Sequence, residues 1–196
     1  MSSLRQRKRR TPRPLRSSVR QNDTRRLMAR IVIFGNSGSG KSTLARALAE
    51  RSSCSHLDLD TVAWDEGHES PTRRSLIDSE TEIGLFLANN PNWVIEGCYS
   101  DLLAFVLPHS TEIIFLNPGT ETCIGNSTTR PWEPHKYDSP EAQNANLELL
   151  IAWIEQYEER ADEFSLQAHR QLFDDYQGRK REYTSNEAWA VPRSRT

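Results

Sequence analysis

The chain has 196 residues, with 25 Lys and Arg against 27 Asp and Glu, a size that suits one α/β domain and leaves little room for two. Its longest apolar stretches, residues 102–107 and 149–154, fall far short of the roughly 20 residues that a membrane-spanning helix requires. Its three cysteines are odd in number and form no CxxC pair. This argues against a disulfide framework or a cysteine-based zinc site, and it favours the reducing cytoplasm.

Charge is divided unevenly along the chain. Residues 1–27 contain ten Lys and Arg and one acid, a net +9, and subtracting this from the overall −2 leaves −11 for residues 28–196. The segment has few apolar residues and no periodicity, so we expect residues 1–27 to form a disordered basic extension. Its composition is typical of a nucleic-acid-binding arm, a nuclear-localisation-like cluster or an organellar presequence. The alternative is that translation begins at Met28 and the extension is dispensable.

From residue 31 onward, short apolar runs alternate with segments of helical spacing. Strands are predicted at 31–34, 57–59, 93–95, 113–116 and, at an edge, 180–183. Helices are predicted at 41–51, 73–88, around 102–107, and at 140–160 and 165–176. This βαβα order predicts an α/β domain over residues 28–185, with a doubly wound parallel sheet, followed by a flexible tail over residues 186–196.

Residues 35–42 match GxxxxGK[ST] at every fixed position, directly after an apolar strand and at the start of a helix. In such a loop the backbone N–H groups turn inward around a phosphate, and the helix N-terminus adds favourable partial charge. We expect Lys41 to reach the β- and γ-phosphates and Ser42 to contact Mg²⁺. No Asn-Lys-x-Asp guanine motif follows a strand, which favours ATP. The predicted nucleotide-binding residues are Gly35, Asn36, Ser37, Gly38, Ser39, Gly40, Lys41, Ser42 and Thr43.

A phosphate loop also needs carboxylates near its metal, usually at the ends of neighbouring strands. Asp58 and Asp60 occupy alternate positions of one predicted strand and so point the same way, and Glu96 ends another. We expect Asp58 to serve Mg²⁺, and Asp60 or Glu96 to position the acceptor hydroxyl. The alternative for Asp58 is a local cap. The fourth strand is followed by Asn117 instead of an acid.

Three segments, IVIFGNSGSGKSTLARALAE, HLDLDTVAW and WVIEGCYSD, resemble the small P-loop kinase group that contains shikimate and adenylate kinases. The resemblance covers residues 29–120 and is greatest to the shikimate-kinase-like, adenylate-kinase-like and topology-modulation branch. It implies a core parallel sheet, a helical acceptor-binding insertion and a mobile lid. Asp58 and Asp60 are similar to the pair that shikimate kinases use for magnesium and the acceptor alcohol. The triple glycine of those enzymes is replaced by Glu96-Gly97-Cys98, which implies an acceptor other than shikimate.

Residues 129–137 contain two prolines and no periodicity, so they are predicted to form a loop. Lid loops of kinases supply cations to the transferred phosphate, and Arg130 is the residue expected to do so here. The sequence therefore predicts a cytoplasmic, Mg²⁺-dependent kinase that transfers phosphate from ATP to a small-molecule acceptor. The alternative is an ATP-binding switch or nucleic-acid-associated regulator with slow hydrolysis, which the basic extension and Asn117 favour.

Overall fold

A computed structural model describes residues 28–65, 72–133 and 138–189. The basic extension predicted for residues 1–27 lies outside the described residues. Among the described residues, no helix has both the length and the apolar character needed to cross a membrane.

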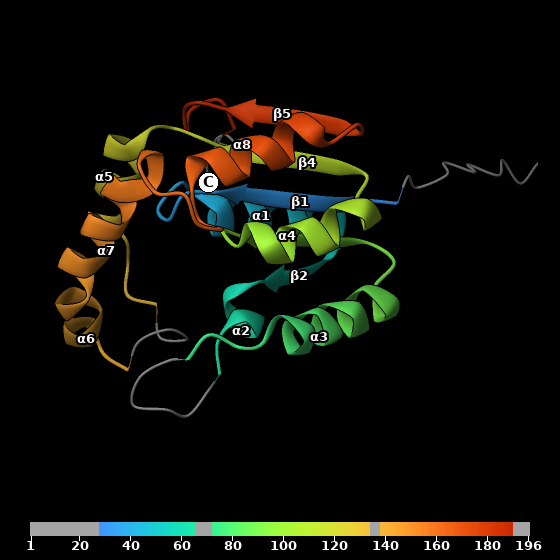
Figure 1. The fold of residues 1–196 in the computed structure, drawn as a ribbon, viewed down its shortest axis with the longest axis horizontal. Coiled ribbons are helices and arrows are strands. Elements are labelled where there is room, and N and C mark those ends of the chain that lie inside the picture. The colour runs from blue at the N-terminus through green and yellow to red at the C-terminus, as the bar shows by residue number, and fades with distance from the viewer. Residues whose placement is uncertain (1–27, 66–71, 134–137, 190–196) are drawn as a thin grey trace, which may run out of the picture.

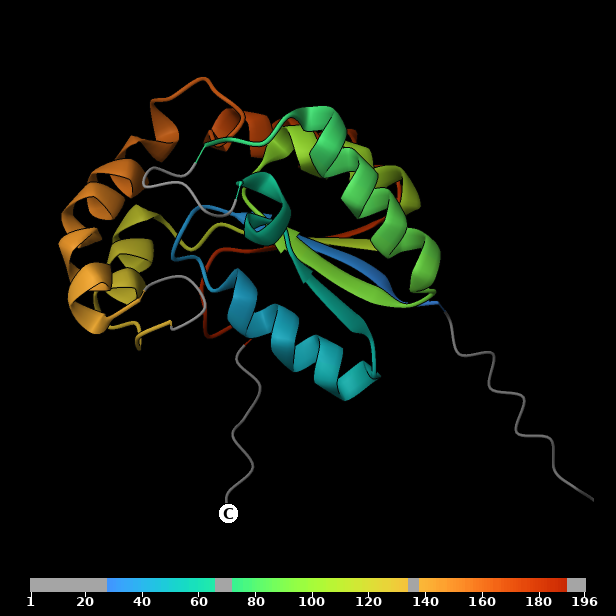
Figure 2. The same ribbon diagram turned by 90° about the horizontal axis from the view of Figure 1, so that it is seen from below.

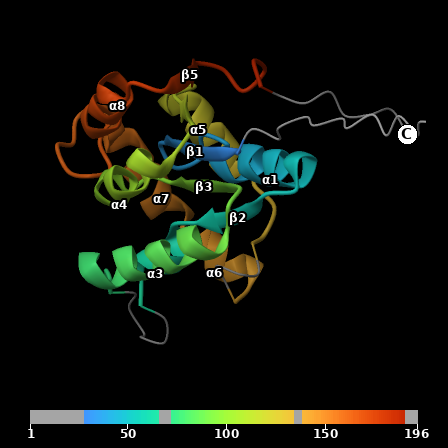
Figure 3. The ribbon, with the colours of Figure 1, turned by 90° about the vertical axis from the view of Figure 1, so that its right-hand side faces the viewer.

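The centre of the molecule is a five-stranded sheet in which every pairing is parallel (Figures 1 and 3). The spatial order is β2-β3-β1-β4-β5, so the first strand of the chain lies in the middle. The strands are β1 (Arg30–Gly35), β2 (Ser55–Asp58), β3 (Trp93–Gly97), β4 (Glu112–Leu116) and β5 (Arg179–Tyr183). This arrangement confirms the predicted α/β fold with helices on both faces, and β5 lies at an edge as expected.

Alternation of side chains along the strands builds two cores. In β3, Trp93 and Ile95 join one cluster while Val94 joins the other. The first cluster is covered by α3 (Leu76–Asn89), α4 (Ser100–Val106) and α8 (Leu166–Asp175), and the second by α1 (Lys41–Ser52), as Figure 2 shows. Because the period of a strand is two residues, Glu96 falls on the side of Val94 and therefore of α1.

Several helices differ in extent from their predictions. The first turn predicted at residue 73 is absent, because Ser75 caps α3 by accepting from the Asp78 N–H. The helix predicted over 140–160 is interrupted at Asn146, and the segment forms α6 (Pro140–Ala145), α7 (Leu147–Glu155) and a 3₁₀ turn at Gln156–Glu158. Helix α6 begins at residue 140, as predicted, with Pro140 in its first position and Ser139 as a cap that accepts the Ala142 N–H.

Helix α5 (Thr120–Thr128) was not predicted. Its Thr, Gly, Asn and Ser residues favour helix only weakly, so burial and not propensity accounts for it. Figure 1 shows α5, α6 and α7 grouped beyond the edge of the sheet at which β1 ends. Parallel sheets bind ligands at this edge, outside the carboxyl ends of the strands.

Candidate functional site

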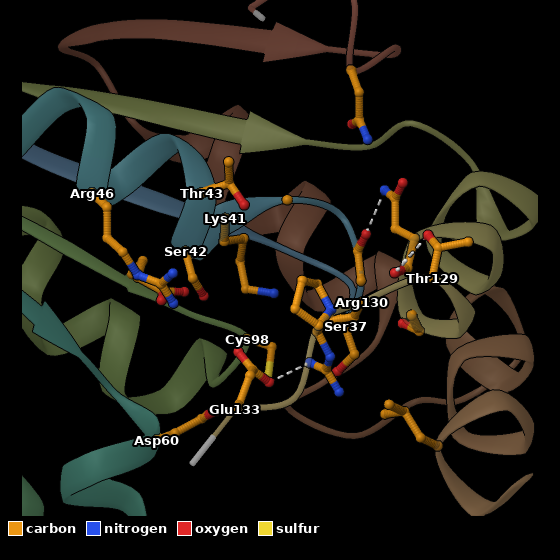
Figure 4. Close-up of a pocket in the computed structure, with 18 of the residues that line it drawn as sticks. Ser37, Lys41, Ser42, Thr43, Arg46, Asp60, Cys98, Thr129, Arg130 and Glu133 are labelled. Carbon is orange, nitrogen blue, oxygen red and sulfur yellow. Dashed lines mark hydrogen bonds and ion pairs between the residues drawn. The ribbon is translucent and has the colours of Figure 1, made fainter. Parts of the chain in front are cut away.

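A cavity of about 770 Å³ opens at the carboxyl edge of the sheet, and Figure 4 shows most of the residues that line it. The phosphate loop, the start of α1, helix α5 and residues 129–133 form its walls. Predicted site residues that line it are Ser37, Gly38, Gly40, Lys41, Ser42, Thr43, Asp60, Glu96 and Arg130. The fold thus brings together groups from β3, α1, α2 (Asp60–Ala63) and the loop after α5.

The phosphate loop holds a backbone shape that requires glycine. Gly35 has φ +147° and Gly38 has φ +75°, both in the region that side-chain-bearing residues rarely adopt. A Cβ on Gly35 would lie 2.1 Å from the carbonyl oxygen of Leu116, and one on Gly38 would lie 2.3 Å from that of Cys123. The loop therefore passes directly against β4 and α5, with its concave side left to the cavity.

Lys41 is held by the loop itself. Its Nζ donates to the Asn36 carbonyl oxygen at 2.8 Å, and the same oxygen accepts the Ser39 N–H at 3.2 Å. Figure 4 shows the Lys41 side chain projecting into the cavity between Ser42 and Arg130. The ammonium is therefore held within the cavity by the backbone of the loop.

Hydrogen bonds from two asparagine amides join the loop to α7 and α5. Asn36 Nδ2 donates to the Ile154 carbonyl of α7 at 3.2 Å, and Asn126 Nδ2 of α5 donates to the Gly38 carbonyl at 2.8 Å. Asn36 and Ser39, both predicted to bind nucleotide, are buried behind the loop and their side chains do not line the cavity.

Glu96 is 2% exposed, and its Oε1 has no hydrogen-bond partner in the part of the chain that the structure describes. Burial, together with the charge of Asp58, its register partner on β2, raises the pKa of Glu96 to about 7. The charge of Lys41 and a hydrogen bond from Ser42 oppose this rise in pKa. Glu96 is therefore a carboxyl that changes protonation near neutral pH beside the phosphate loop.

The predicted geometry of Asp58 and Asp60 is wrong. The strand ends at Asp58, and Asp60 is the first residue of α2, so the two side chains do not alternate along one strand. Asp58 Oδ1 accepts the Asp60 N–H at 3.0 Å, which is the local capping alternative. Asp60 lines the cavity and Asp58 does not.

Asp60 is oriented by two aromatic side chains. The Tyr99 hydroxyl donates to Asp60 Oδ1 at 2.7 Å, and Trp64 Nε1 donates to that hydroxyl at 2.7 Å. Burial raises the pKa of Tyr99, so its hydroxyl keeps the proton that it donates. These two hydrogen bonds orient the whole Asp60 carboxylate, including Oδ2.

Arg130 lies in the cavity wall and forms an ion pair with Glu133 at 3.0 Å (Figure 4). Gln143 of α6 holds this segment, because its side chain accepts the Glu133 N–H at 2.9 Å and donates to the Pro131 carbonyl at 3.3 Å. The remainder of the predicted lid, residues 134–137, lies outside the described residues.

The residues present fit a magnesium-bound nucleoside triphosphate. A glycine cradle, a lysine and a helix N-terminus converge on one side of the cavity, and Glu96 places a buried oxygen without a hydrogen-bond partner on the other. Among the described residues, no group of three His, Cys, Asp or Glu is placed to hold a metal by itself. Mg²⁺ at such sites takes one or two protein ligands and completes its shell with phosphate oxygens and water. Ser42, with Asp60 or Glu96, would hold it.

Some wall residues were missed in the sequence. Asn126 lies on the unpredicted helix α5, and Glu133 carries no motif. Asn186 and Trp189 lie in the predicted flexible tail, yet they line the cavity, and a Cβ on Gly40 would lie 2.7 Å from the Trp189 ring. The folded part of the chain therefore continues beyond residue 185. An isolated tryptophan near the end of a polar segment is the one signal that pointed to this.

No protein-family model matches the chain. It is 33% identical to an uncharacterized protein, YqaC, of Bacillus subtilis (strain 168), over 39% of this chain and 47% of that protein. The chain thus spans about half the length of this curated relative.

Three solved structures have similar folds. A gluconokinase from Sinorhizobium meliloti 1021 is 20% identical, with a TM-score of 0.42 over 70% of this chain and 79% of that one. A shikimate kinase from Acinetobacter baumannii, in complex with shikimate, is 18% identical, with a TM-score of 0.38 over 75% and 92%. A deoxyadenosine kinase from M. mycoides with bound dATP is 14% identical, with a TM-score of 0.40 over 80% and 91%.

Proposed function

We propose that this protein is a Mg²⁺-dependent kinase that transfers the γ-phosphoryl group of ATP to a hydroxyl of a small-molecule acceptor. The observation that carries the proposal is the convergence of Lys41, Ser42 and Asp60 on one cavity at the carboxyl edge of the sheet. A binding protein needs the phosphate loop alone. An oriented carboxylate across the cavity from Lys41 is what a phosphoryl acceptor requires.

Each residue has a separate role in the proposed transfer, set by its position in the cavity. MgATP supplies the phosphoryl group and the metal charge that neutralises it. Lys41 binds the phosphate oxygens and stabilises the charge that develops on them, while Thr43 and the loop N–H groups orient the nucleotide. Asp60, held by Tyr99, accepts a hydrogen bond from the acceptor hydroxyl and takes its proton as the acceptor oxygen bonds to the γ-phosphorus. The bond from that phosphorus to the β–γ bridging oxygen breaks, and ADP leaves. Arg130 leaves Glu133 to contact the transferred group.

Substitution of Lys41 by Ala tests the donor half of the proposal. We expect MgATP affinity to fall at least tenfold, by about 1.4 kcal/mol or more, because the ammonium on the phosphates is lost. Calorimetric titration measures the affinity, and thermal unfolding shows whether the fold is retained. Unchanged MgATP affinity in a folded variant would contradict the site assignment.

The alternative is an ATP-binding switch, and one observation favours it: Asn117 follows β4 where an acid is usual, and its amide donates to Glu182 at 3.3 Å. A switch hydrolyses ATP slowly whatever acceptor is present. A kinase consumes ATP much faster with one class of acceptor, and that stimulation disappears in Asp60→Asn. ATP consumption with and without pooled hydroxyl compounds separates the two.

A further inference from the structure

His169 of α8 is a fully buried histidine whose two ring nitrogens bind different parts of the molecule. Its Nε2 lies 2.9 Å from the carbonyl oxygen of Cys98, and its Nδ1 lies 2.7 Å from the hydroxyl of Tyr157. Because a carbonyl oxygen only accepts, Nε2 carries the proton and Nδ1 accepts from the Tyr157 hydroxyl. Burial lowers the pKa of His169 to about 4, so the ring is neutral at pH 7 and keeps this arrangement.

The His169 ring is also held by packing against the sheet. It meets Phe34 of β1 and Phe115 of β4 edge-on, at centroid distances of 5.7 and 6.2 Å. Tyr157, on the 3₁₀ turn at Gln156–Glu158, fixes the other side of the ring through its hydroxyl. Two central strands and this turn therefore set the direction in which Nε2 donates.

The Cys98 carbonyl belongs to the turn between β3 and α4, and this turn carries groups of the candidate site. Glu96 and Cys98 line the cavity. The peptide group of the Cys98 carbonyl ends on the nitrogen of Tyr99, whose hydroxyl donates to Asp60 Oδ1 at 2.7 Å. Since a peptide group is planar, a hydrogen bond to this carbonyl fixes the direction in which Tyr99 leaves the backbone.

Two further contacts hold the same turn against the segment that leads into α8. The Glu163 carbonyl accepts the Ser100 N–H at 3.0 Å, and the Phe164 ring meets the Tyr99 ring edge-on at a centroid distance of 5.3 Å. His169 lies farther along the same segment and holds the carbonyl that precedes Tyr99. The turn therefore rests on residues 163–169, which give Tyr99 a rigid support.

We propose that His169 is a positioning residue for the Asp60 carboxylate and that it acts through the Cys98 carbonyl. Tyr157 fixes the direction of the histidine donor, and Tyr99 carries the effect to Asp60. The inference rests on the proposed phosphoryl transfer, in which Asp60 must face the acceptor hydroxyl. Groups that are held in this way by a second layer of hydrogen bonds keep the geometry that proton transfer requires.

The nucleotide half of the site has a different support. The Asn36 amide donates to the Ile154 carbonyl, and the Asn36 carbonyl accepts from Lys41 Nζ. Neither bond involves His169. We therefore expect loss of the His169 donor to lower the rate of transfer and to leave MgATP affinity unchanged, a difference that general destabilisation of the fold does not produce.

Trp64 reports where the Tyr99 side chain lies, because its indole N–H donates to the Tyr99 hydroxyl at 2.7 Å. In ¹H–¹⁵N NMR spectra of the full chain, Trp64→Phe identifies this indole signal. His169→Phe keeps a ring but neither nitrogen, and we expect the Trp64 indole proton to exchange with solvent about tenfold faster, the cost of about one hydrogen bond. His169→Gln should restore slow exchange, because an amide also offers a donor and an acceptor.

Tyr157→Phe tests the same support without changing the histidine, and it keeps the test open if His169→Phe does not fold. We expect it to accelerate exchange of the Trp64 proton in the same direction. Tyr176→Phe is the matched control, since it removes a tyrosine hydroxyl that binds the Ser110 carbonyl at 3.2 Å at the other end of α8. Exchange in this control should equal that of the wild type.

The same variants are compared in ATP consumption stimulated by a pool of sugars, polyols and nucleosides. We expect His169→Phe to lower the stimulated rate at saturating MgATP at least about tenfold, because the Asp60 carboxylate loses its direction. The KM for MgATP should stay as in the wild type. His169→Gln should recover most of the rate.

Unchanged exchange of the Trp64 proton in both His169→Phe and Tyr157→Phe would overturn this inference and leave the proposed transfer intact. Equal effects of Tyr157→Phe and Tyr176→Phe would overturn it as well, because the turn before α4 would then not respond to His169 in particular. If the Trp64 proton responds as expected but the pool stimulates no ATP consumption in the wild type, His169 still positions Tyr99 and the transfer reaction itself is overturned.

Discussion

Glu96 shows how one residue is governed by its surroundings. It is the last residue but one of β3, a strand in which all five residues are buried. The groups around it include the acid Asp58, the cation Lys41 and the imidazole of His56, whose Nε2 lies 3.9 Å from Glu96 Oε1. Burial and Asp58 oppose ionisation more strongly than Lys41 and Ser42 favour it, so the pKa rises to about 7. The folded protein therefore holds this proton more tightly than the unfolded chain does.

Glu96 should make stability depend on pH. Because its pKa is about 7 when folded and about 4.5 when unfolded, its stabilising contribution is complete below pH 4.5 and is lost as pH rises through 7. Glu96→Gln lacks this titration. Between pH 5 and 8 we expect wild type to lose on the order of 3 kcal/mol of unfolding free energy relative to Glu96→Gln, as measured by urea denaturation.

An exposed glutamate on α7 provides the control, and Glu148→Gln should leave the pH dependence of the wild type unchanged. If the unfolding free energies of wild type and Glu96→Gln changed with pH in parallel, the pKa of Glu96 would be that of a glutamate in water.

Asn126 is a second residue of this kind, because its hydrogen bond to the phosphate loop links it to Lys41. Its amide holds the Gly38 carbonyl, and the N–H on the opposite edge of that planar peptide binds the Asn36 oxygen that also accepts from Lys41. Asn126→Ala should lower MgATP affinity about fivefold, the cost of about one hydrogen bond, in calorimetric titration.

Asn89→Ala is the matched control, since it removes an amide-to-carbonyl bond of the same 2.8 Å length at the end of α3. If Asn126 acts through Lys41, adding Asn126→Ala to Lys41→Ala should reduce affinity no further. Fully additive losses would show that the two residues act independently.

At the scale of elements, the phosphate loop depends on glycine where it touches its neighbours. Gly38→Ala places a Cβ against the Cys123 carbonyl at a positive φ, so we expect the unfolding free energy to fall by at least about 2 kcal/mol. MgATP affinity should fall as well, because the loop must move away from α5. Thermal and urea unfolding measure the first effect and calorimetry the second.

The same substitution within α5 should act in the opposite direction. Gly125 has no atom within 4 Å of an added Cβ, and helix interiors favour Ala over Gly by about 0.5–1 kcal/mol. A Gly125→Ala protein is expected to be slightly more stable than wild type. If Gly125→Ala lowered the unfolding free energy as much as Gly38→Ala does, the expectation that an added Cβ fits at Gly125 would be wrong.

At the scale of the whole molecule, charge separates the chain into two parts. A segment of +9 precedes a domain of −11, and release of counterions makes such a segment bind polyanions in a salt-sensitive way. The full chain should retain nucleic acid at low salt, and a chain that begins at Met28 should not. Gel-shift titration at two or more salt concentrations measures this.

Both chains should bind MgATP equally and melt at the same temperature, because every cavity-lining residue and both core clusters lie after Met28 among the described residues. A large loss of affinity or melting temperature on truncation would show that residues 1–27 take part in the working fold.

The parallel α/β domain and the phosphate loop could be predicted from the sequence, because both depend on local patterns of residues. Short apolar runs predict the strands, and fixed glycines before Lys41 and Ser42 predict the loop. Cap chemistry likewise indicates where α6 begins, because Ser139 is a favourable N-cap and Pro140 suits the first helical position.

Tertiary structure alone decided the rest of the site. Whether Asp58 or Asp60 faces the cavity depended on where β2 ends, which is set by its pairing with Glu96 and its neighbours. Helix α5 forms against the loop despite weak propensity, and Trp189 returns to Gly40 from near the end of the chain. These contacts join residues far apart in sequence, and their free energy comes from burial and packing, which no local pattern of residues records.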